Sequence, residues 1–290
     1  MKKISVVTLL LLLVVGLSKT QAKPTEASPA RKVIDNMLNA IIKNKGSVYT
    51  MKGTERIKGK AAPNVTEIFT KINVSPHKIY GKILSELNKG TELLYAKGER
   101  GDKVRVNPGK YLPSLNLPHT SSLLTKDQHH TILTSGFMIV HKLMNEGIKR
   151  ADAQGGFDKV FKLEGEVTYN GKKCYKVVID DPTYAYVNAT GLAGEDLYTF
   201  ARRLLIPESA IMDLNGLKHF DDNVAGKTLK VPTSYAKRTV LYIDEQINFP
   251  IYQEMSDEKG VFEKYEYSNL NVNPVFRADE FSETFSEYKF

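Results

Sequence analysis

A period of two between apolar and charged residues is the feature of this sequence that most constrains its fold. Over residues 65–74, for example, Ile68 and Ile72 share one side, while Glu67 and Lys71 take the other. A strand of this kind buries one face and leaves the other in water, which is typical of an antiparallel sheet. We therefore expect an α+β fold built on a large antiparallel sheet.

The same period predicts strands along most of the chain. Asn170-Gly171 is the strongest of the hairpin signals between them, and residues 107–124, with three prolines, are expected to form a long loop. The other predicted strands are 47–57, 77–84, 92–96, 103–106, 159–169, 173–180, 238–244, 251–256 and 261–268.

Two stretches change to the three-and-four spacing of an amphipathic helix. The first begins at Ser28, a good N-cap residue followed by Pro29, and ends at Gly46. The second is predicted over residues 127–149. Each has one apolar side, so each is expected to pack against the sheet.

Residues 1–22 resemble a signal peptide. Two lysines precede an apolar run from Ile4 to Leu17, and Thr20-Gln-Ala22 supplies a small-residue cleavage site. The run is short for a membrane span, although an uncleaved anchor stays open as an alternative. No cysteine follows it to carry a lipid. We expect a periplasmic protein that begins near Lys23 and is not an integral membrane protein.

The charge of the chain is unevenly distributed. Residues 23–150 hold 22 basic and 10 acidic residues, a net +12, whereas residues 233–290 hold 6 and 11, a net −5. The basic half either forms a surface for an anionic envelope polymer or lipid, or is partly neutralised by the acidic end in the fold. The sequence has no basic-aromatic motif of the kind that binds nucleic acid, so we expect no nucleic acid as a partner.

Nothing in the sequence indicates a catalytic, metal or cofactor site. The single cysteine, Cys174, excludes a disulfide scaffold and has no recognisable base nearby. His130 and His141 are spaced to share a helix face, but two histidines without an acid do not make a metal site. We expect no catalytic residues, no metal and no cofactor; an unrecognised envelope enzyme remains the alternative.

Residues 183–232 differ from their surroundings and read as strand, helix, helix, strand. Gly194-Glu195-Asp196 opens the first helix, Pro207 opens the second, and Asn215-Gly216 ends it. This segment resembles the LysM domain. Gly194 to Leu197 stands where that family has Gly-Asp-Thr-Leu, and 225–232 matches Pro-Gly-Gln-x-Leu-x-Ile-Pro, with Ala225 in place of proline and Asp196 in place of threonine.

The resemblance implies binding of peptidoglycan or another N-acetylglucosamine polymer in a groove between two loops. The alternative is a degenerate module kept for packing or for contact with another protein. The residues that the resemblance places in the groove are Gly194, Glu195, Asp196, Leu197, Leu217, Asn223 and Val224.

The sequence on either side of this insert resembles LolA/LolB-like proteins, the periplasmic lipoprotein carriers, and more closely a bacterial branch known as a domain of unknown function. The run from Tyr242 through Phe249-Pro250 to Asn273 carries the resemblance. It implies a curved antiparallel half-barrel with helices on its concave side. The expected domains are a signal peptide (1–22), a discontinuous half-barrel (23–182 and 233–290) and the LysM-like insert (183–232).

A half-barrel whose helices do not fill its concave face leaves a cleft for an acyl chain or a lipidated partner. The alternative is that the helices only complete the core. We expect a non-catalytic envelope protein that binds glycan and lipid, with a purely structural or protein-binding role as the other possibility. The candidate cleft-lining residues are Val33, Met37, Ile41, Phe137, Val140 and Met144.

Overall fold

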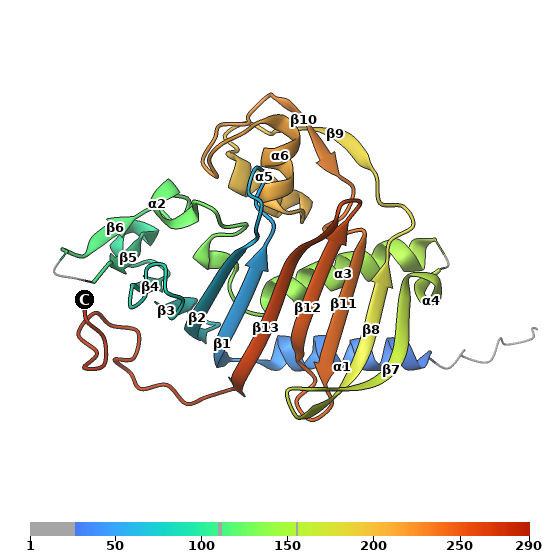
Figure 1. Cartoon of the computed structure of the whole chain (residues 1–290), viewed down its shortest axis with the longest axis horizontal. Helices are drawn as coiled ribbons and strands as arrows, with labels where there is room; N and C mark the ends of the chain where they lie inside the picture. The colour runs from blue at the N-terminus through green and yellow to red at the C-terminus, as the bar shows by residue number, and fades with distance from the viewer. Residues whose placement is uncertain (1–26, 110–111, 155) are drawn as a thin grey trace, which may run out of the picture.

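The computed structural model describes residues 27–109, 112–154 and 156–290 (Figure 1). The predicted signal peptide, residues 1–22, lies outside the described residues. Among the residues that are described, no helix is both long enough and apolar enough to cross a membrane.

The described chain is built on one sheet of eleven strands, all paired antiparallel, in the order β6-β5-β4-β3-β2-β1-β13-β12-β11-β8-β7. The edge strands β6 and β7 are not paired with each other, so the sheet is open. The predicted large antiparallel sheet is confirmed. The strands are β1 (Gly46–Glu55), β2 (Asn64–Asn73), β3 (Lys78–Ile83), β4 (Glu92–Ala96), β5 (Val104–Asn107), β6 (Leu115–Leu117), β7 (Phe161–Tyr169), β8 (Lys172–Asp180), β11 (Arg238–Asp244), β12 (Pro250–Asp257) and β13 (Gly260–Val272).

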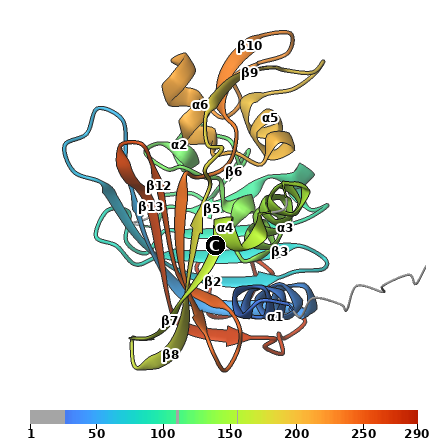
Figure 2. The same cartoon turned by 90° about the vertical axis from the view of Figure 1, so that its right-hand side faces the viewer.

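Two longer helices, α1 (Pro29–Lys43) and α3 (Met138–Ala153), lie on the same side of the curved sheet (Figure 2). Ser28 caps α1 as predicted, because its hydroxyl accepts a hydrogen bond from the backbone N–H of Arg31. Both helices bury their apolar sides in one core shared with the sheet. The helix α4 (Phe157–Val160) and two 3-10 turns, η1 (Arg100–Asp102) and η2 (Ile132–Thr134), are short connections.

The predicted start of the second helix, residue 127, is wrong. Within the predicted range 127–149 the α-helix begins only at Met138, and it continues to Ala153. The preceding residues form η2 and loop, and the short helix α2 (Ser122–Thr125) lies before the predicted range. The break comes from Gly136, which has a φ of 89°. That backbone conformation is left-handed and cannot continue a right-handed helix. The predicted loop at 107–124 also contains the short strand β6.

The segment after β8 has the predicted order of strand, helix, helix, strand: β9 (Tyr186–Thr190), α5 (Leu197–Leu204), α6 (Glu208–Asn215) and β10 (Thr228–Pro232). Its two strands pair only with each other, and its side chains form a separate core. We call residues 183–232 the insert. Figure 1 shows it above the ends of β1 and β13.

The last fifteen residues, 276–290, cross the face of the sheet opposite the helices. Tyr288 stacks on Tyr80 with ring centroids 3.7 Å apart. Glu280 pairs with Lys71 at 2.7 Å, and Glu283 with Arg105 at 2.9 Å. The acidic end of the chain thus neutralises part of the basic first half, which was one of the two interpretations of the charge pattern.

Candidate functional site

A cavity of about 880 Å³ lies between the concave face of the sheet and α3. This volume falls within the range of about 300–1,000 Å³ that is typical of small-molecule sites. Most of its wall is apolar. The aliphatic side chains come from the sheet (Met51, Ile68, Ile83, Leu93, Val106, Leu115, Leu117, Leu241 and Met255) and from α3 (Ile139, Val140, Leu143 and Met144).

The cavity exists because the inward-facing side chains do not meet across it. Ile68, Leu93 and Leu143 face the interior, yet each is only partly buried. Well-packed cores leave few voids larger than a water molecule. Apolar side chains that stay accessible inside a domain therefore indicate a space for a ligand.

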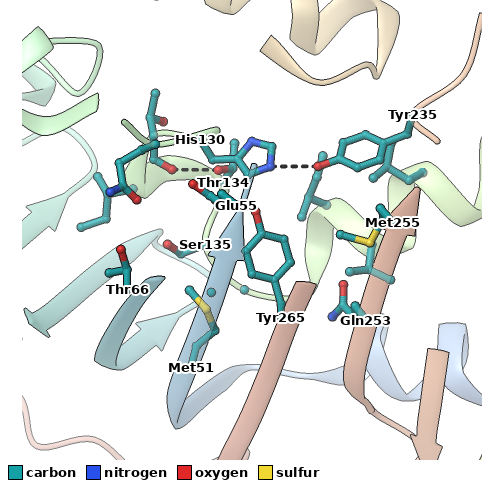
Figure 3. Close-up of a pocket in the computed structure, with 18 of the residues that line it drawn as sticks. Met51, Glu55, Thr66, His130, Thr134, Ser135, Tyr235, Gln253, Met255 and Tyr265 are labelled. Carbon is teal, nitrogen blue, oxygen red and sulfur yellow. Dashed lines mark hydrogen bonds between the residues drawn. The ribbon is translucent and has the colours of Figure 1, made fainter. Parts of the chain in front are cut away.

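Polar side chains line the part of the cavity below the insert (Figure 3). Thr66, Ser135, Gln253 and Tyr265 supply hydroxyl and amide groups, and His130 closes this wall. The site therefore combines a large apolar wall with a few hydrogen-bonding groups, which is the usual composition of a small-molecule site.

Only two of the six predicted cleft residues line this cavity, Val140 and Met144. The helix α1 does not take part, because Val33, Met37 and Ile41 are buried in the core. A single helix, α3, therefore forms the helical wall, and α1 completes the core.

Phe137 does not line the cavity either. Its ring packs edge-on against Tyr49 and Phe249, with centroid distances of 5.9 and 4.9 Å. These contacts hold Phe137 in the core, just before the first turn of α3.

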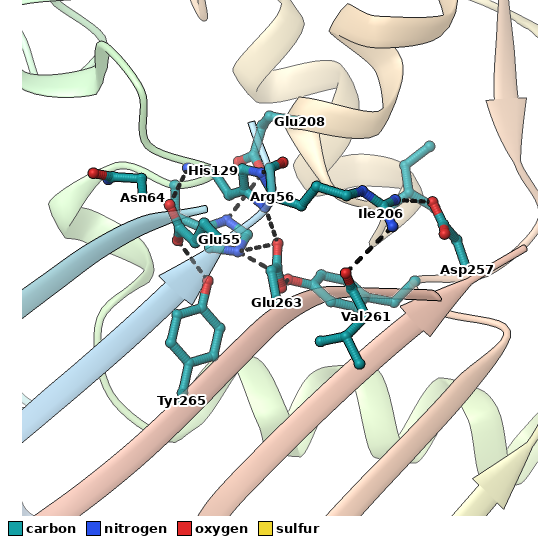
Figure 4. A network of polar contacts seen from close by, with 12 residues as sticks. Glu55, Arg56, Asn64, His129, Ile206, Glu208, Asp257, Val261, Glu263 and Tyr265 are labelled. Atoms are coloured by element: carbon teal, nitrogen blue, oxygen red, sulfur yellow. Dashed lines mark hydrogen bonds and ion pairs between the residues drawn. The ribbon is translucent and has the colours of Figure 1, made fainter. Parts of the chain in front are cut away.

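A buried polar network lies where β1 ends and β13 begins (Figure 4). Glu263 has no exposed surface, and its carboxylate lies 2.8 Å from Nδ1 of His129. The other ring nitrogen of His129 lies 3.0 Å from the backbone oxygen of Arg56. Both nitrogens face acceptors, so both must donate and His129 is an imidazolium. Glu55 accepts from the backbone N–H of His129 and from the hydroxyl of Tyr265.

His130 links this network to the insert. Its Nδ1 lies 3.3 Å from Glu208 of α6, and its Nε2 lies 2.8 Å from the hydroxyl of Tyr235, which itself donates to Glu263. Burial alone would lower the pKa of His130, but the carboxylates of Glu263 and Glu208 outweigh burial and raise the pKa to about 10. Burial would raise the pKa of Glu263, yet His130 and His129 hold it well below its usual range.

These charges compensate one another and do not form a recognisable catalytic or metal site. Burial raises the pKa of the Cys174 thiol to about 11, so this thiol is not an activated nucleophile. No group of three or more potential metal ligands occurs in the part of the chain that the structure describes. The expected shared helix face of His130 and His141 is wrong, because His130 precedes α3.

The insert brings together the two loops that the LysM resemblance placed around a groove. The backbone N–H of Leu197 donates to Asp222, and that of Val224 donates to Glu195. Asp196 and Asn223 form an isolated bridge between the loops. The predicted residues therefore lie side by side.

Several of the predicted groove side chains already have structural roles. Leu197 and Val224 are fully buried in the insert core. Glu195 pairs with Arg203 at 2.6 Å, and Asp196 caps α5 in a capping box. Gly194 and Asn223 are exposed and Leu217 is partly buried, so these three leave surface for a ligand.

Sequence reasoning missed the network and part of the cavity wall, although some signals were present. Glu55 has the same strand parity as Tyr49 and Met51, and Glu263 the same parity as Tyr265. An acid at an inward-facing position of a strand indicates a buried polar network. Nothing in the sequence indicated the contribution of the insert, whose Leu204 and Leu205 line the cavity.

Comparison with known proteins identifies one family match. Residues 45–187 match the model of a family described as a protein of unknown function (DUF1571). The match takes in β1 to β8 and leaves out α5, α6 and β10 to β13. No protein with a curated function matches the sequence.

Three of the solved structures that are similar to this chain have the following identity and coverage. Lipoprotein LppX from Mycobacterium tuberculosis is 11% identical, with a TM-score of 0.40 over 84% of this chain and 96% of that one. LprF from Mycobacterium bovis is 10% identical, with a TM-score of 0.43 over 87% and 98%. A LolA superfamily protein from Nitrosomonas europaea is 8% identical, with a TM-score of 0.28 over 86% and 96%.

Proposed function

We propose that this protein binds an acyl lipid, or the acyl chains of a lipidated partner, in the cavity between the sheet and α3. The observation that carries the proposal is the cavity itself, with about 880 Å³ of space and an aliphatic wall. Water forms few hydrogen bonds against such a wall. A hydrocarbon chain is favoured there, because it leaves water and makes van der Waals contacts with the wall.

The transfer free energy shows how much hydrocarbon a useful affinity requires. Burying about ten methylene groups would contribute on the order of 8 kcal/mol by transfer estimates. Association costs at least about 4 kcal/mol of lost motion, so ten methylene groups alone would give about millimolar affinity, and micromolar affinity requires a longer or a second acyl chain. The hydroxyl and amide groups of Thr66, Ser135 and Gln253 would hold an ester or hydroxyl group of the same ligand.

We place this activity in the cell envelope, and we propose a binding protein rather than an enzyme. The signal-peptide-like residues 1–22 support export. The inactive thiol of Cys174 and the mutually paired network around Glu263 support a role without catalysis. The domain organisation that we propose is a discontinuous sheet domain with an insert at 183–232.

The test is native mass spectrometry of the mature protein purified from its own host, followed by lipid extraction. We expect a co-purifying acyl species that is released on unfolding. A protein that carries no lipid and takes up none from a mixed lipid extract would refute the proposal.

We also propose that the insert contacts peptidoglycan. This second function is favoured by one observation, the backbone bonds that join the loops at Leu197–Asp222 and Glu195–Val224. Retention on purified peptidoglycan would test it. The Asn223→Ala variant should be retained less than the wild type, while an Asn188→Ala variant on β9 serves as a control. Absence of retention of the wild-type protein would refute this function without affecting lipid binding.

A further inference from the structure

Three leucines surround the end of the cavity near β6 and α2, and all three are exposed. Leu112, Leu115 and Leu123 line the cavity, yet they expose 61%, 43% and 75% of their surface. Isolated exposed leucines are ordinary on protein surfaces. A group of them at the rim of one apolar cavity is not, because grouped apolar surface marks an interaction site. We call these three residues the leucine rim.

The sequence around the leucine rim has an excess of positive charge. From Lys103 to Lys126 it holds four basic residues and no Asp or Glu. Arg105 is paired with Glu283, and Asp127, which follows Lys126, is paired with Lys60. Lys126, three residues after Leu123, is exposed, and none of the described residues forms an ion pair with it. An apolar surface with a cation beside it matches the boundary between the acyl chains and the headgroups of an anionic bilayer.

We propose that the leucine rim is a membrane-docking surface, at which the protein rests on an anionic lipid bilayer. The cavity lining also includes Leu117 on β6 and Leu124 on α2, the same two elements that carry Leu115 and Leu123 of the rim. A lipid that leaves the bilayer at this point reaches the cavity without exposing its chains to water. The inference builds on the proposed lipid cavity, but it concerns the surface through which the lipid passes.

The other occupant that an apolar rim suggests is a second copy of this chain. The positive charge argues against it, because two copies meeting at this surface would bring like charges together. A bilayer that contains anionic lipid supplies the opposite charge. This difference makes the dependence on lipid charge the decisive measurement.

The absence of tryptophan from the sequence provides a direct test. A Leu123→Trp variant carries a single tryptophan at the rim, and Val275→Trp carries one at a position that is 98% exposed and does not line the cavity. Each is mixed with vesicles of phosphatidylcholine alone and with vesicles that also contain phosphatidylglycerol. We expect a blue shift of the Leu123→Trp emission with the anionic vesicles, and no shift for Val275→Trp.

Vesicle flotation measures how much the rim residues contribute to membrane binding. The triple variant Leu112→Ser, Leu115→Ser, Leu123→Ser should float at least about a hundredfold less, since burying one leucine is worth about a factor of ten or more. Lys126→Gln, which removes one positive charge, should weaken flotation by about fivefold and only with anionic vesicles. An unchanged urea midpoint in each variant shows that the fold is intact, as expected for exposed positions.

Four results would overturn the docking surface. They are a Leu123→Trp shift that is absent or no larger with anionic than with neutral vesicles, an equal shift for Val275→Trp, undiminished flotation of the triple variant, and a shift that depends on protein concentration without vesicles. The last would identify a second copy as the occupant. Lipid extraction from the same preparations keeps the two proposals separable, because cargo can be present without docking and docking can occur without cargo.

Discussion

The carboxylate of Glu263 lies 2.8 Å from Nδ1 of His129, and neither side chain has more than 5% of its surface exposed. Replacing Glu263 by Gln keeps the volume but removes the anion that pairs with His129 and one of the two carboxylates beside His130. Removing one partner of a buried ion pair typically costs about 3–5 kcal/mol. We expect a loss of this size in the free energy of unfolding from urea titration. The control Glu86→Gln, at an exposed pair with Lys89, should change stability by less than about 1 kcal/mol. A cost for Glu263→Gln as small as that of the control would contradict the network.

The pH dependence of stability should reflect His130. Its pKa is raised from the ordinary value of about 6.5 to about 10 in the folded protein. A raised pKa means that its contribution is complete below pH 6.5 and is lost as the pH rises toward 10. The free energy of unfolding from urea titration should therefore decrease as the pH rises from 6.5 to 9.5. For this one proton the decrease is at most about 1.4 kcal/mol per pH unit.

The variant His130→Gln should flatten this dependence, because it removes the proton that the folded state retains. His219→Gln, at an exposed position on the insert, is the matched control and should leave the slope unchanged. If the stability of the His130→Gln variant depends on pH as steeply as that of the wild type, other groups cause the pH dependence.

Gly136 should be intolerant of a side chain. Its φ is 89°, and a Cβ at this position would lie 2.8 Å from Cδ1 of Ile72. Gly136→Ala should therefore cost about 1–3 kcal/mol from backbone strain and more from the clash. Gly98→Ala, with a similar φ of 83° but nothing within 4 Å, should show the strain alone. The double variant Gly136→Ala, Ile72→Val removes Cδ1, so its cost should be less than the sum of the two single changes.

Filling the cavity should displace the lipid that we propose it binds, while preserving the fold. Ile139 and Leu143 face the cavity from α3. A tryptophan at either position occupies space that the cargo would need, so the lipid recovered per mole of protein should fall several-fold. Ile42→Trp, on the exposed side of α1, keeps the added ring outside the cavity and should leave the recovery unchanged. Equal recovery from all three variants would place the lipid elsewhere.

The sheet, except for β6, was predictable because each of its other strands carries its own signal. The period of two around Ile68 and the Asn170-Gly171 turn depend on local sequence, and both predictions hold in β2 and in the β7–β8 hairpin. The start of α3 was not predictable from spacing alone. Ile132 and Leu133 fit a helical stripe, but the left-handed backbone at Gly136 interrupts it.

The cavity was only partly predictable, because it depends on distances between elements rather than on their patterns. Met37 and Met144 both occupy apolar helical stripes, yet one fills the core and the other lines the cavity. Periodicity identifies which side of a helix faces inward, but not whether side chains from the opposite sheet reach it. The insert, through Leu204, adds a wall that no local signal indicates.

The pairing of β1 with β13 has a consequence for how the chain folds. Ser47 is in register with Val272, so the centre of the sheet joins segments from opposite ends of the sequence. Contacts of such long sequence separation form slowly, because the loop between them must close first. While the polypeptide emerges from the ribosome, β1 has only one of its two neighbours. The sheet therefore stays incomplete until β13 has been synthesised, which leaves an interval in which the export that we propose could begin before the chain has folded.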